Sequence, residues 1–207
     1  MRFTKSLNQS STMARLNQAV FLDRDGTINE EVSYLADLTQ LRLIEGAAAA
    51  IGRLNREAFK VVVVSNQSGV ARGYLAEDSV QHVHSALRER LERAHAQVDA
   101  FYYCPHHPTE GIGPYRRDCH CRKPKPGMLE RAARELQIDL NNSFIVGDRL
   151  SDLIAGHAVG CKPILVQTGF GHETQKALIG CPVQPVFIAA TLLEACEWIL
   201  RICEKIS

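Results

Sequence analysis

The sequence predicts a three-layer, Rossmann-like α/β fold, a parallel sheet with helices on both of its faces. Three observations predict this fold. Short apolar runs recur along the chain, segments with helical periodicity separate them, and polar residues follow several of the runs where a strand would end. Strands that alternate with helices pair in parallel, because each helix carries the chain back to the edge where the next strand begins.

Six apolar runs are expected to form the strands. They are residues 19–22, 60–64, 99–103, 143–147, 162–167 and 185–189. Apolar residues at helical spacing predict helices in most of the gaps, including residues 47–58, 80–94 and 129–136. The last helix is expected to begin with a capping box formed by Thr191 and Glu194. Four cysteines outside the metal motif described below are assigned to the core: Cys161, Cys181, Cys196 and Cys203.

A chain of 207 residues is long enough for one well-buried core, and this length favours one domain over two. We expect that domain at residues 19–207, after a flexible tail at residues 1–18 that is rich in Ser, Asn and Gln. About 38 residues separate Thr27 from Ser65 and about 54 separate Ser68 from Lys123, which leaves no room for a large cap domain.

Charge and hydropathy exclude several classes of partner. The 24 basic and 23 acidic residues leave a net charge of +1, so no nucleic-acid or membrane-binding surface is expected. No run approaches the roughly 20 apolar residues that cross a bilayer, and residues 1–18 lack the apolar core of a secretory signal. The sequence therefore predicts a cytoplasmic protein that acts on a small molecule. Without an apolar surplus or a coiled-coil pattern, a monomer is expected.

The most informative stretch is residues 21–27, which sets two carboxylates two residues apart where an apolar run ends. Ligand sites of open α/β sheets lie at the carboxyl ends of strands, and residues two apart in a strand point the same way. We expect Asp23 at a reacting position and Asp25 within reach of the leaving oxygen. The alternative is a simple turn, since Asp and Gly are common turn residues.

Three further polar segments follow in order along the chain. Ser65 comes after the apolar run at 61–64, Lys123 lies in a basic, Pro-rich segment, and Asp148 follows the run at 144–147. An Asp-x-Asp pair, a hydroxyl, a lysine and a distal acid in this order resemble the haloacid dehalogenase superfamily of phosphatases. The resemblance implies phosphoryl transfer that depends on Mg²⁺.

A second motif, rich in Cys and His, lies between the hydroxyl and the lysine. Cys104 and His106 stand on one side of 12 residues, and Cys119 and Cys121 stand on the other. Three thiolates and one imidazole complete a tetrahedral zinc shell with no open position, which is typical of a structural site. Paired clusters of this kind favour a metal over disulfides in a reducing compartment. Unrelated surface cysteines are the less favoured alternative.

These clusters narrow the resemblance to the zinc-bearing branch of the superfamily, which contains heptose-1,7-bisphosphate 7-phosphatases and histidinol-phosphate phosphatases. Residues 66–73 and the 12-residue loop are similar to the heptose enzymes, because histidinol phosphatases typically shorten that loop. The likeness runs from about Ala19 to Gly169. It implies removal of the 7-phosphate of D-glycero-D-manno-heptose 1,7-bisphosphate, a step toward nucleotide-activated heptose for bacterial lipopolysaccharide.

Resemblance and chemistry agree on the roles of the motif residues. Asp23 is expected to be the nucleophile that forms an aspartyl-phosphate, and Asp25 the general acid and base. The Asp23 carboxylate, the Asp25 backbone carbonyl and Asp148 are expected to hold Mg²⁺. Ser65 and Lys123 are expected to grip the phosphoryl oxygens.

Other residues are predicted to contact the substrate or to support the site. Arg122 is expected to bind the second phosphate, because a guanidinium can make a bidentate contact with phosphate; a solvated basic patch is the alternative. Asp152 is expected either to orient Lys123 or a metal-bound water, or to serve as an acid at a helix N-terminus. The predicted substrate contacts also include Glu31, Val32, Ser33, Tyr34, Ser65, Asn66, Gln67, Ser68, Lys123 and Arg149.

Two other functions are weighed against the heptose reaction. One is the hydrolysis of histidinol phosphate or of other small phosphomonoesters by the same mechanism. The other is a zinc-dependent binding module on an inactive phosphatase fold. The near-neutral charge disfavours a nucleic-acid module, and the intact set of motif residues disfavours an inactive site.

Overall fold

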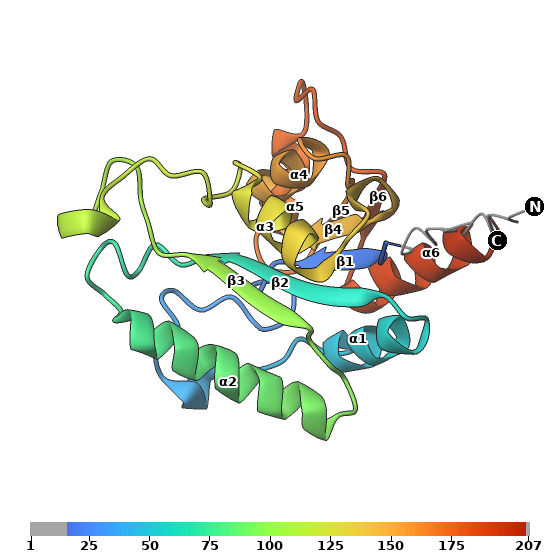
Figure 1. The fold of residues 1–207 in the computed structure, drawn as a ribbon, viewed down its shortest axis with the longest axis horizontal. Coiled ribbons are helices and arrows are strands. Elements are labelled where there is room, and N and C mark those ends of the chain that lie inside the picture. The colour runs from blue at the N-terminus through green and yellow to red at the C-terminus, as the bar shows by residue number, and fades with distance from the viewer. Residues whose placement is uncertain (1–15, 206–207) are drawn as a thin grey trace, which may run out of the picture.

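The strands that the structure describes form one sheet in the order β3-β2-β1-β4-β5-β6, and every neighbouring pair is parallel (Figure 1). The structure is a computed structural model, and it describes residues 16–205. The strands are β1 Ala19–Leu22, β2 Lys60–Asn66, β3 Ala100–Cys104, β4 Phe144–Gly147, β5 Lys162–Val166 and β6 Phe187–Ala189. The prediction of a parallel sheet from six apolar runs is therefore confirmed.

Helices cover both faces of the sheet. The α-helices are α1 Ala47–Arg56, α2 Glu77–Arg93, α3 Gly127–Leu136, α4 Leu150–His157, α5 Gly171–Ala177 and α6 Leu192–Glu204. Short 3₁₀ helices lie at Leu38–Gln40, Gly113–Tyr115 and Leu140–Asn142. In Figure 1, α1, α2 and α6 lie below the sheet, and α3, α4 and α5 lie above it.

Alternation along the strands divides the core in the same way. Val20 and Leu22 of β1 face the cluster that packs with α1, α2 and α6, whereas Ala19 and Phe21 face the cluster that packs with α3. A third cluster, around Leu153, joins α4 to β5. Because the central strands are buried on both faces, they read in the sequence as continuous apolar runs.

The four cysteines assigned to the core differ in depth. Cys161 and Cys196 are buried, while Cys181 and Cys203 are half-buried and pack against the apolar clusters. The capping box predicted for α6 is half present. The Thr191 hydroxyl accepts from the backbone N of Glu194 at 3.3 Å, but the Glu194 carboxylate accepts from Ala190 N, one residue before the cap.

The segment predicted as a flexible tail is described only at residues 16–18, and those residues are attached to the domain instead. The backbone N of Asn17 donates to Gln137 O at 2.8 Å, and Asn17 O accepts from the N of Asp139 at 2.8 Å. The rest of the predicted tail lies outside the described residues. None of the described helices is long and apolar enough to cross a membrane.

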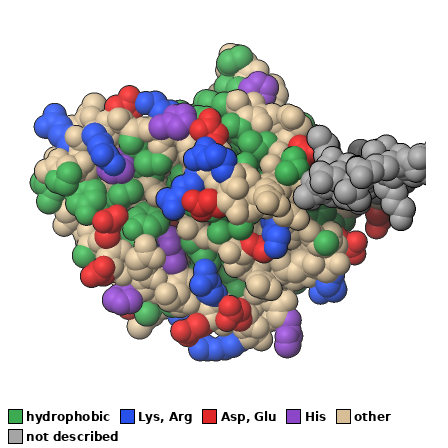
Figure 2. Space-filling model, in the orientation of Figure 1, with side chains coloured by type: hydrophobic (Ala, Val, Ile, Leu, Met, Phe, Trp, Pro, Cys, Tyr) green, Lys and Arg blue, Asp and Glu red, His purple; other side chains and the backbone are tan. Residues whose placement is uncertain are grey.

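Charged side chains of both signs are interspersed on the face of the molecule in Figure 2, which matches the small net charge. The carboxyl ends of the strands meet at one edge of the sheet, and the loops that leave them line a single pocket. The longest of these loops, residues 105–126, projects beyond the end of β3 at the left of Figure 1.

Candidate active site

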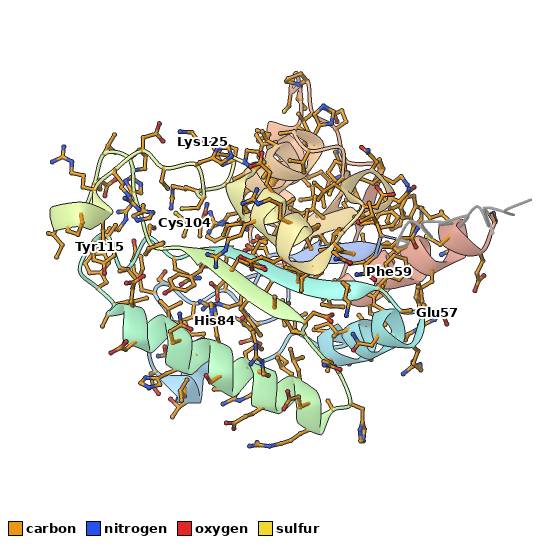
Figure 3. All side chains as sticks on the ribbon, viewed as in Figure 1. Glu57, Phe59, His84, Cys104, Tyr115 and Lys125 are labelled. Carbon is orange, nitrogen blue, oxygen red and sulfur yellow. The ribbon has the colours of Figure 1, made fainter. Side chains whose placement is uncertain are left out.

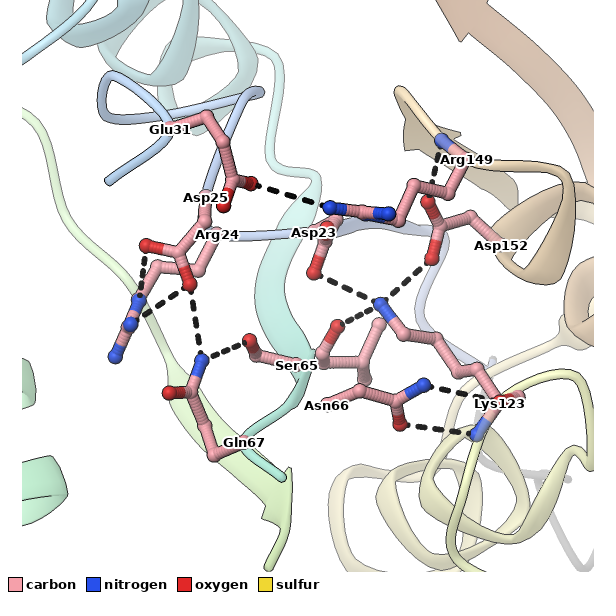
Figure 4. A network of polar contacts seen from close by, with 11 residues as sticks. Asp23, Arg24, Asp25, Glu31, Ser65, Asn66, Gln67, Lys123, Arg149 and Asp152 are labelled. Atoms are coloured by element: carbon pink, nitrogen blue, oxygen red, sulfur yellow. Dashed lines mark hydrogen bonds and ion pairs between the residues drawn. The ribbon is translucent and has the colours of Figure 1, made fainter. Parts of the chain in front are cut away.

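A buried lysine joins two carboxylates at the centre of the pocket. The Lys123 Nζ lies 2.8 Å from Asp23 Oδ1 and 2.7 Å from Asp152 Oδ1, and it also donates to Val64 O at 2.5 Å (Figure 4). All three charged side chains are at most 8% exposed. Burial alone would lower the pKa of Lys123, but Asp152 and Asp23 outweigh it and hold that pKa above its ordinary value. The ammonium is therefore a fixed positive charge beside Asp23.

The strand ends place these groups. Asp23 directly follows β1, Ser65 is near the end of β2, and Asp148 directly follows β4. Neither Asp23 nor Asp25 lies within the strand, because β1 already ends at Leu22. Asp25 lies in a turn, yet both aspartates line the same pocket.

Asp152 fulfils both functions that were weighed for it. Besides its ion pair with Lys123, its Oδ2 accepts from the backbone N of Arg149 at 3.0 Å and so caps α4. The helix thus fixes the carboxylate that orients the lysine.

Asp148 is fully buried and closely surrounded. Its Oδ2 accepts from the backbone N of Phe170 at 2.7 Å, whereas its Oδ1 has no hydrogen-bond partner. Two glycines make room for it: a Cβ on either Gly26 or Gly169 would lie 2.3 Å from Asp148 Oδ2. The backbones of these glycines are in the left-handed region, at φ +78° and +55°.

The buried carboxylates around Lys123 repel one another. Burial raises the pKa of Asp148 to about 8, and the nearby charge of Asp23 adds to the effect. Burial likewise raises the pKa of Asp23 to about 6, although Lys123 acts in the opposite direction. A single ammonium does not compensate three buried carboxylates, so the cluster lacks positive charge.

The donor set fits a hard cation. One carboxylate oxygen from each of Asp23, Asp148 and Asp152 lies within 4.8 Å of the other two. The unpartnered Oδ1 of Asp148 is the buried acceptor that a cation would satisfy. Oxygen ligands of this kind are the ones that Mg²⁺ prefers.

Asp25 belongs to a separate hydrogen-bond network. Arg24 donates from Nε and Nη2 to its two oxygens at 3.0 and 2.7 Å, and Asn29 Nδ2 donates to Oδ1 at 2.9 Å. Gln67 Nε2 donates to Oδ2 at 3.0 Å. Burial alone would raise the pKa of Asp25, but the guanidinium and these hydrogen bonds lower it below its ordinary value.

The residues that follow β2 have different partners. Gln67 Nε2 also donates to Ser65 Oγ at 2.7 Å, which joins the predicted phosphate-gripping hydroxyl to Asp25. The Asn66 amide pairs with the backbone of Lys123, donating to its O at 2.9 Å and accepting from its N at 3.1 Å. Asn66 therefore anchors the lysine segment to β2 while lining the pocket.

The pocket has a volume of about 430 Å³. Every catalytic and substrate-contacting residue predicted from the sequence lines this pocket. These residues are Asp23, Asp25, Glu31, Val32, Ser33, Tyr34, Ser65, Asn66, Gln67, Ser68, Arg122, Lys123 and Arg149. Asp148 lies beneath the floor, at 0% exposure. It is therefore not among the residues that line the pocket.

Two arginines stand at the pocket wall. Arg122 Nη1 donates to His106 O at 3.0 Å, which ties it to the Cys/His loop. The Arg149 guanidinium lies 3.8 Å from the centre of the Phe170 ring and 3.6 Å from Glu31 Oε2. Both are placed to add positive charge at the mouth of the pocket.

The four Cys and His residues of the second motif come together at the end of β3. The three Sγ atoms of Cys104, Cys119 and Cys121 lie 3.3–3.4 Å apart, and His106 Nδ1 lies 3.4 Å from Cys121 Sγ and 3.6 Å from Cys104 Sγ. These separations are far beyond a disulfide bond length of about 2.05 Å. They approach the edges of about 3.8 Å expected for a tetrahedron with Zn–S bonds of about 2.3 Å.

Sequence reasoning missed several residues of the site. Arg24, Asn29, Arg72 and Phe170 were not singled out, although each contacts a site group or lines the pocket. Two signals were present in the sequence. A basic residue stands between two acids at the end of an apolar strand, and residues 168–171 form a Gly-containing turn after β5.

Curated relatives match most of the chain. A D-glycero-beta-D-manno-heptose-1,7-bisphosphate 7-phosphatase from Pasteurella multocida is 45% identical over 155 residues, which cover 74% of this chain and 84% of the relative. A D-glycero-D-manno-heptose-1,7-bisphosphate 7-phosphatase from Thermosynechococcus vestitus is 43% identical over 185 residues, which cover 87% and 94%.

A solved structure and a family model agree with these relatives. The D,D-heptose 1,7-bisphosphate phosphatase from B. bronchiseptica, solved in complex with magnesium and phosphate, aligns with a TM-score of 0.78 and 34% identity. The alignment covers 89% of this chain and 99% of that structure. A family model described as HAD-hydrolase-like matches residues 120–195.

Proposed function

Because the chain belongs to the D-glycero-D-manno-heptose-1,7-bisphosphate 7-phosphatase family of the haloacid dehalogenase superfamily, we propose that it removes the 7-phosphate of that bisphosphate. The chain is a phosphoric monoester hydrolase of heptose metabolism. The prediction of this superfamily and branch from the sequence motifs is confirmed.

The observation that carries the proposal is the convergence of four groups on one small polar pocket. Asp23 supplies a carboxylate, Lys123 a buried ammonium, Ser65 a hydroxyl, and Asp148 the unpartnered oxygen beneath them. A phosphoryl group carries charge on three oxygens, and its transfer depends mostly on positioning and charge stabilisation. A nucleophile flanked by fixed positive charge meets that need.

Two displacements make up the proposed reaction. An Asp23 carboxylate oxygen attacks phosphorus and forms an aspartyl-phosphate, the bond from phosphorus to the sugar oxygen breaks, and that oxygen takes a proton from Asp25. Water then attacks the aspartyl-phosphate, gives its proton to Asp25, and releases phosphate with Asp23 restored. Ser65 and Lys123 bind the phosphoryl oxygens in both steps.

The cation proposed for the acidic cluster is Mg²⁺. Asp23, Asp148 and the backbone carbonyl of Asp25 are the proposed ligands, and the proximity of Asp152 to the first two supports the site. When bound, the ion offsets the negative charge of nucleophile and phosphate. The solved structure of the B. bronchiseptica relative, which is in complex with magnesium, supports this choice of ion.

A structural zinc is proposed for Cys104, His106, Cys119 and Cys121. Three thiols and an imidazole within 4.8 Å of one another support this ligand set, and the set leaves no position for substrate. Elemental analysis of the purified protein is expected to give one zinc per chain, and a zinc-free preparation with unchanged stability would contradict the proposal.

The nucleophile is tested by Asp23→Asn. The substitution removes the attacking charge while keeping the size of the side chain, so phosphate release is expected to fall by at least about 10³-fold. Zinc content and the far-UV spectrum are expected to stay unchanged. Full activity in Asp23→Asn would show that the nucleophile is assigned wrongly.

The substrate is tested by kcat/KM for heptose 1,7-bisphosphate and for histidinol phosphate, measured side by side with Mg²⁺. A large preference for the heptose is expected, because Arg122 and Arg149 add positive charge where a second phosphate would lie. Both anomers belong in the assay, since relatives are named with and without the β anomer. A preference for histidinol phosphate would overturn the substrate and leave the mechanism in place.

Two further features stay predictions of the sequence, a monomeric state and a cytoplasmic location. Sedimentation velocity at micromolar concentration tests the first, and fractionation of the source cells tests the second.

A further inference from the structure

Arg24 is the largest of the fully buried side chains, at 1% exposure. Removing a guanidinium from water costs several kcal/mol unless it is paired and hydrogen-bonded. Among the residues that the structure describes, its ion pair is with Asp25, at 2.7 Å from Nη2 to Oδ2, with Nε adding a second bond at 3.0 Å. The contacts with the carboxylate of Asp25 therefore offset the free-energy cost of burying Arg24.

The contacts of Arg24 do not look like those of a structural arginine. A buried arginine that stabilises a fold joins separate elements, but the side chain of Arg24 bonds only to the next residue in the chain. Its remaining nitrogen, Nη1, is buried without a hydrogen-bond partner. Within residues 16–205, the hydrogen bonds of the guanidinium therefore go to Asp25 alone.

The carboxylate that Arg24 holds is fully occupied. An ionised carboxylate has about four acceptor positions, and here Arg24 takes two, while Asn29 and Gln67 take one each. Arg24 and Asn29 belong to the turn that contains Asp25, in which Arg24 O accepts from the N of Ile28 at 2.9 Å. Their contacts are therefore built into the turn.

The fourth contact comes from elsewhere. Gln67 reaches Asp25 Oδ2 from the end of β2 and bonds at the same time to Ser65 Oγ. Figure 4 shows Gln67 between these two groups, with the Arg24 guanidinium on the side of Gln67 that faces away from Ser65. Oδ2 is thus the oxygen on the Ser65 side, and exchange of Gln67 for another partner leaves the turn intact.

We propose that Arg24 is a positioning residue that holds the Asp25 carboxylate with Oδ2 toward the phosphoryl site, where the leaving oxygen replaces Gln67. The proposal rests on the proposed phosphatase function. Both proton transfers pass through this oxygen: the proton goes from Asp25 to the sugar oxygen as its bond to phosphorus breaks, and a proton from the attacking water returns it.

Leaving groups that need no proton distinguish this role from a structural one. In Arg24→Gln, kcat for the sugar phosphate is expected to fall about 10- to 100-fold, part of what a general acid contributes. p-Nitrophenolate is a good leaving group without protonation. The rate constant of the p-nitrophenolate burst in rapid-mixing experiments is therefore expected to change by less than about 3-fold. The later hydrolysis of the aspartyl-phosphate also needs Asp25, so the burst is expected to become larger relative to turnover.

Three matched variants complete the experiment. Arg24→Lys keeps the charge, loses the bidentate contact, and carries the test if Arg24→Gln does not fold. Asp25→Asn is expected to show the same dependence on leaving group, and adding Arg24→Gln to it is expected to cause no further loss with the sugar phosphate. Arg88→Gln, at an exposed arginine of α2, is expected to behave as wild type with both esters.

Equal losses with both esters in folded Arg24→Gln and Arg24→Lys would overturn the proposal in favour of a structural role, as would unchanged rates with both. A wild-type protein that hydrolyses neither ester would instead contradict the proposed function. The two failures are therefore distinguishable.

Discussion

At the scale of single residues, the site depends on backbone that has no room for a Cβ. Gly26 follows the Asp-x-Asp pair, and a Cβ there would lie 2.3 Å from Asp148 Oδ2 and 3.1 Å from the Cα of Gly169. The first distance is shorter than real Cβ contacts and the second is tighter than most of them, so the buried acid would have to move and the facing loop would have to give. The turn after β1 and the loop after β5 thus fix the floor of the pocket jointly.

Gly26→Ala is therefore expected to damage catalysis more than backbone strain explains. We expect at least a 100-fold loss of kcat/KM together with a destabilisation of about 2 kcal/mol or more. Gly180→Ala is the matched control, because Gly180 has the same φ of +78° but nothing within 4 Å of its Cβ position. It is expected to cost about 1 kcal/mol of left-handed strain with activity unchanged, so equal activity in the two variants would contradict the steric argument.

Residue types and their order were readable from the sequence, but the partners of each side chain were not. The motif placed Asp23, Asp148 and Lys123 at strand ends and in one loop, and parallel pairing then brings such ends together. The order of residues in the sequence does not show, however, in which direction each side chain points. The bidentate contact of Arg24 with Asp25 and the Asn66 anchor on Lys123 depend on rotamers that only the folded backbone selects.

At the scale of elements, the loop at residues 105–126, for which a zinc site is proposed and which is called the zinc loop below, carries Lys123 away from the end of β3. Cys104 ends β3, and Cys121 stands two residues before Lys123, with Arg122 between them. Residues 105–126 contain no α-helix or strand of their own, so a metal shared by the two clusters is expected to cross-link this loop. The Asn66 contacts hold the far end of the loop independently.

Cys119→Ser is expected to release zinc and to lower the melting temperature by several degrees, because metal binding contributes directly to folding. The loss of kcat/KM is expected to be moderate, since Asn66 still anchors Lys123. Differential scanning calorimetry with metal analysis measures both effects. Cys181→Ser, outside the cluster, is the control, and an equal shift in melting temperature in both variants would remove the basis for a bracing metal.

Helix α2 contributes a buried histidine to the packing against β3. His84 lies between the helix and the sheet, stacked on Phe101 with 4.9 Å between ring centroids (Figure 3). Burial, together with the charge of Arg24, lowers its pKa to about 3. Arg88 acts in the same direction, whereas Asp25 opposes them. Tyr103 contacts the ring edge-on at 5.6 Å.

His84 is therefore expected to destabilise the protein in acid. Its ordinary pKa is about 6.5, so below that pH the unfolded chain binds a proton that the folded chain excludes. The stability at neutral pH is lost by up to about 1.4 kcal/mol per pH unit as the pH falls from about 6.5 toward 4. Urea denaturation at several pH values measures the slope. His84→Gln is expected to reduce it, and an identical slope in both proteins would mean that His84 titrates normally.

The elements themselves could be predicted to different degrees. Strand β1 was predicted to the residue, and β2 to β5 within one or two residues, because buried parallel strands are continuous apolar runs. Helix α5 could not be specified. It has seven residues, of which only Gly171 and Thr174 are buried, so it shows no apolar periodicity. Strand β6 is shorter than predicted, and two of its three residues, Phe187 and Ile188, are only partly buried at the sheet edge.

At the scale of the whole molecule, the acidic cluster places carboxylates that repel one another between the two halves of the sheet. Asp23 follows β1 and Asp148 follows β4, whereas Asp152 lies in α4. The raised pKa values of Asp23 and Asp148 indicate that the metal-free protein tolerates this repulsion at a cost. A cation bound there is expected to stabilise the entire domain, because it binds the folded chain and not the unfolded one.

Mg²⁺ at about 100 times its dissociation constant is expected to add about 2.7 kcal/mol of stability. For a chain of this size that corresponds to a rise in melting temperature of roughly 5–10 °C. Asp148→Asn is expected to abolish the rise and to stabilise the metal-free protein, because it removes a carboxyl group whose raised pKa of about 8 costs stability at any pH above its ordinary pKa. Thermal melts of both proteins with and without Mg²⁺ test this, and an undiminished rise in Asp148→Asn would exclude Asp148 as a ligand.

The origin of the pocket walls has a consequence for how such a protein diverges. Asp23, Ser65 and Asp148 stand at strand ends inside the packed domain, but much of the pocket wall comes from the loop after β1, the loop after β2 and the zinc loop. These loops lie on the surface, where sequence change is tolerated without repacking the interior. Changes in these loops can therefore alter which substrates bind while the residues at the strand ends are retained. One ancestral phosphatase can in this way give rise to enzymes that act on different substrates.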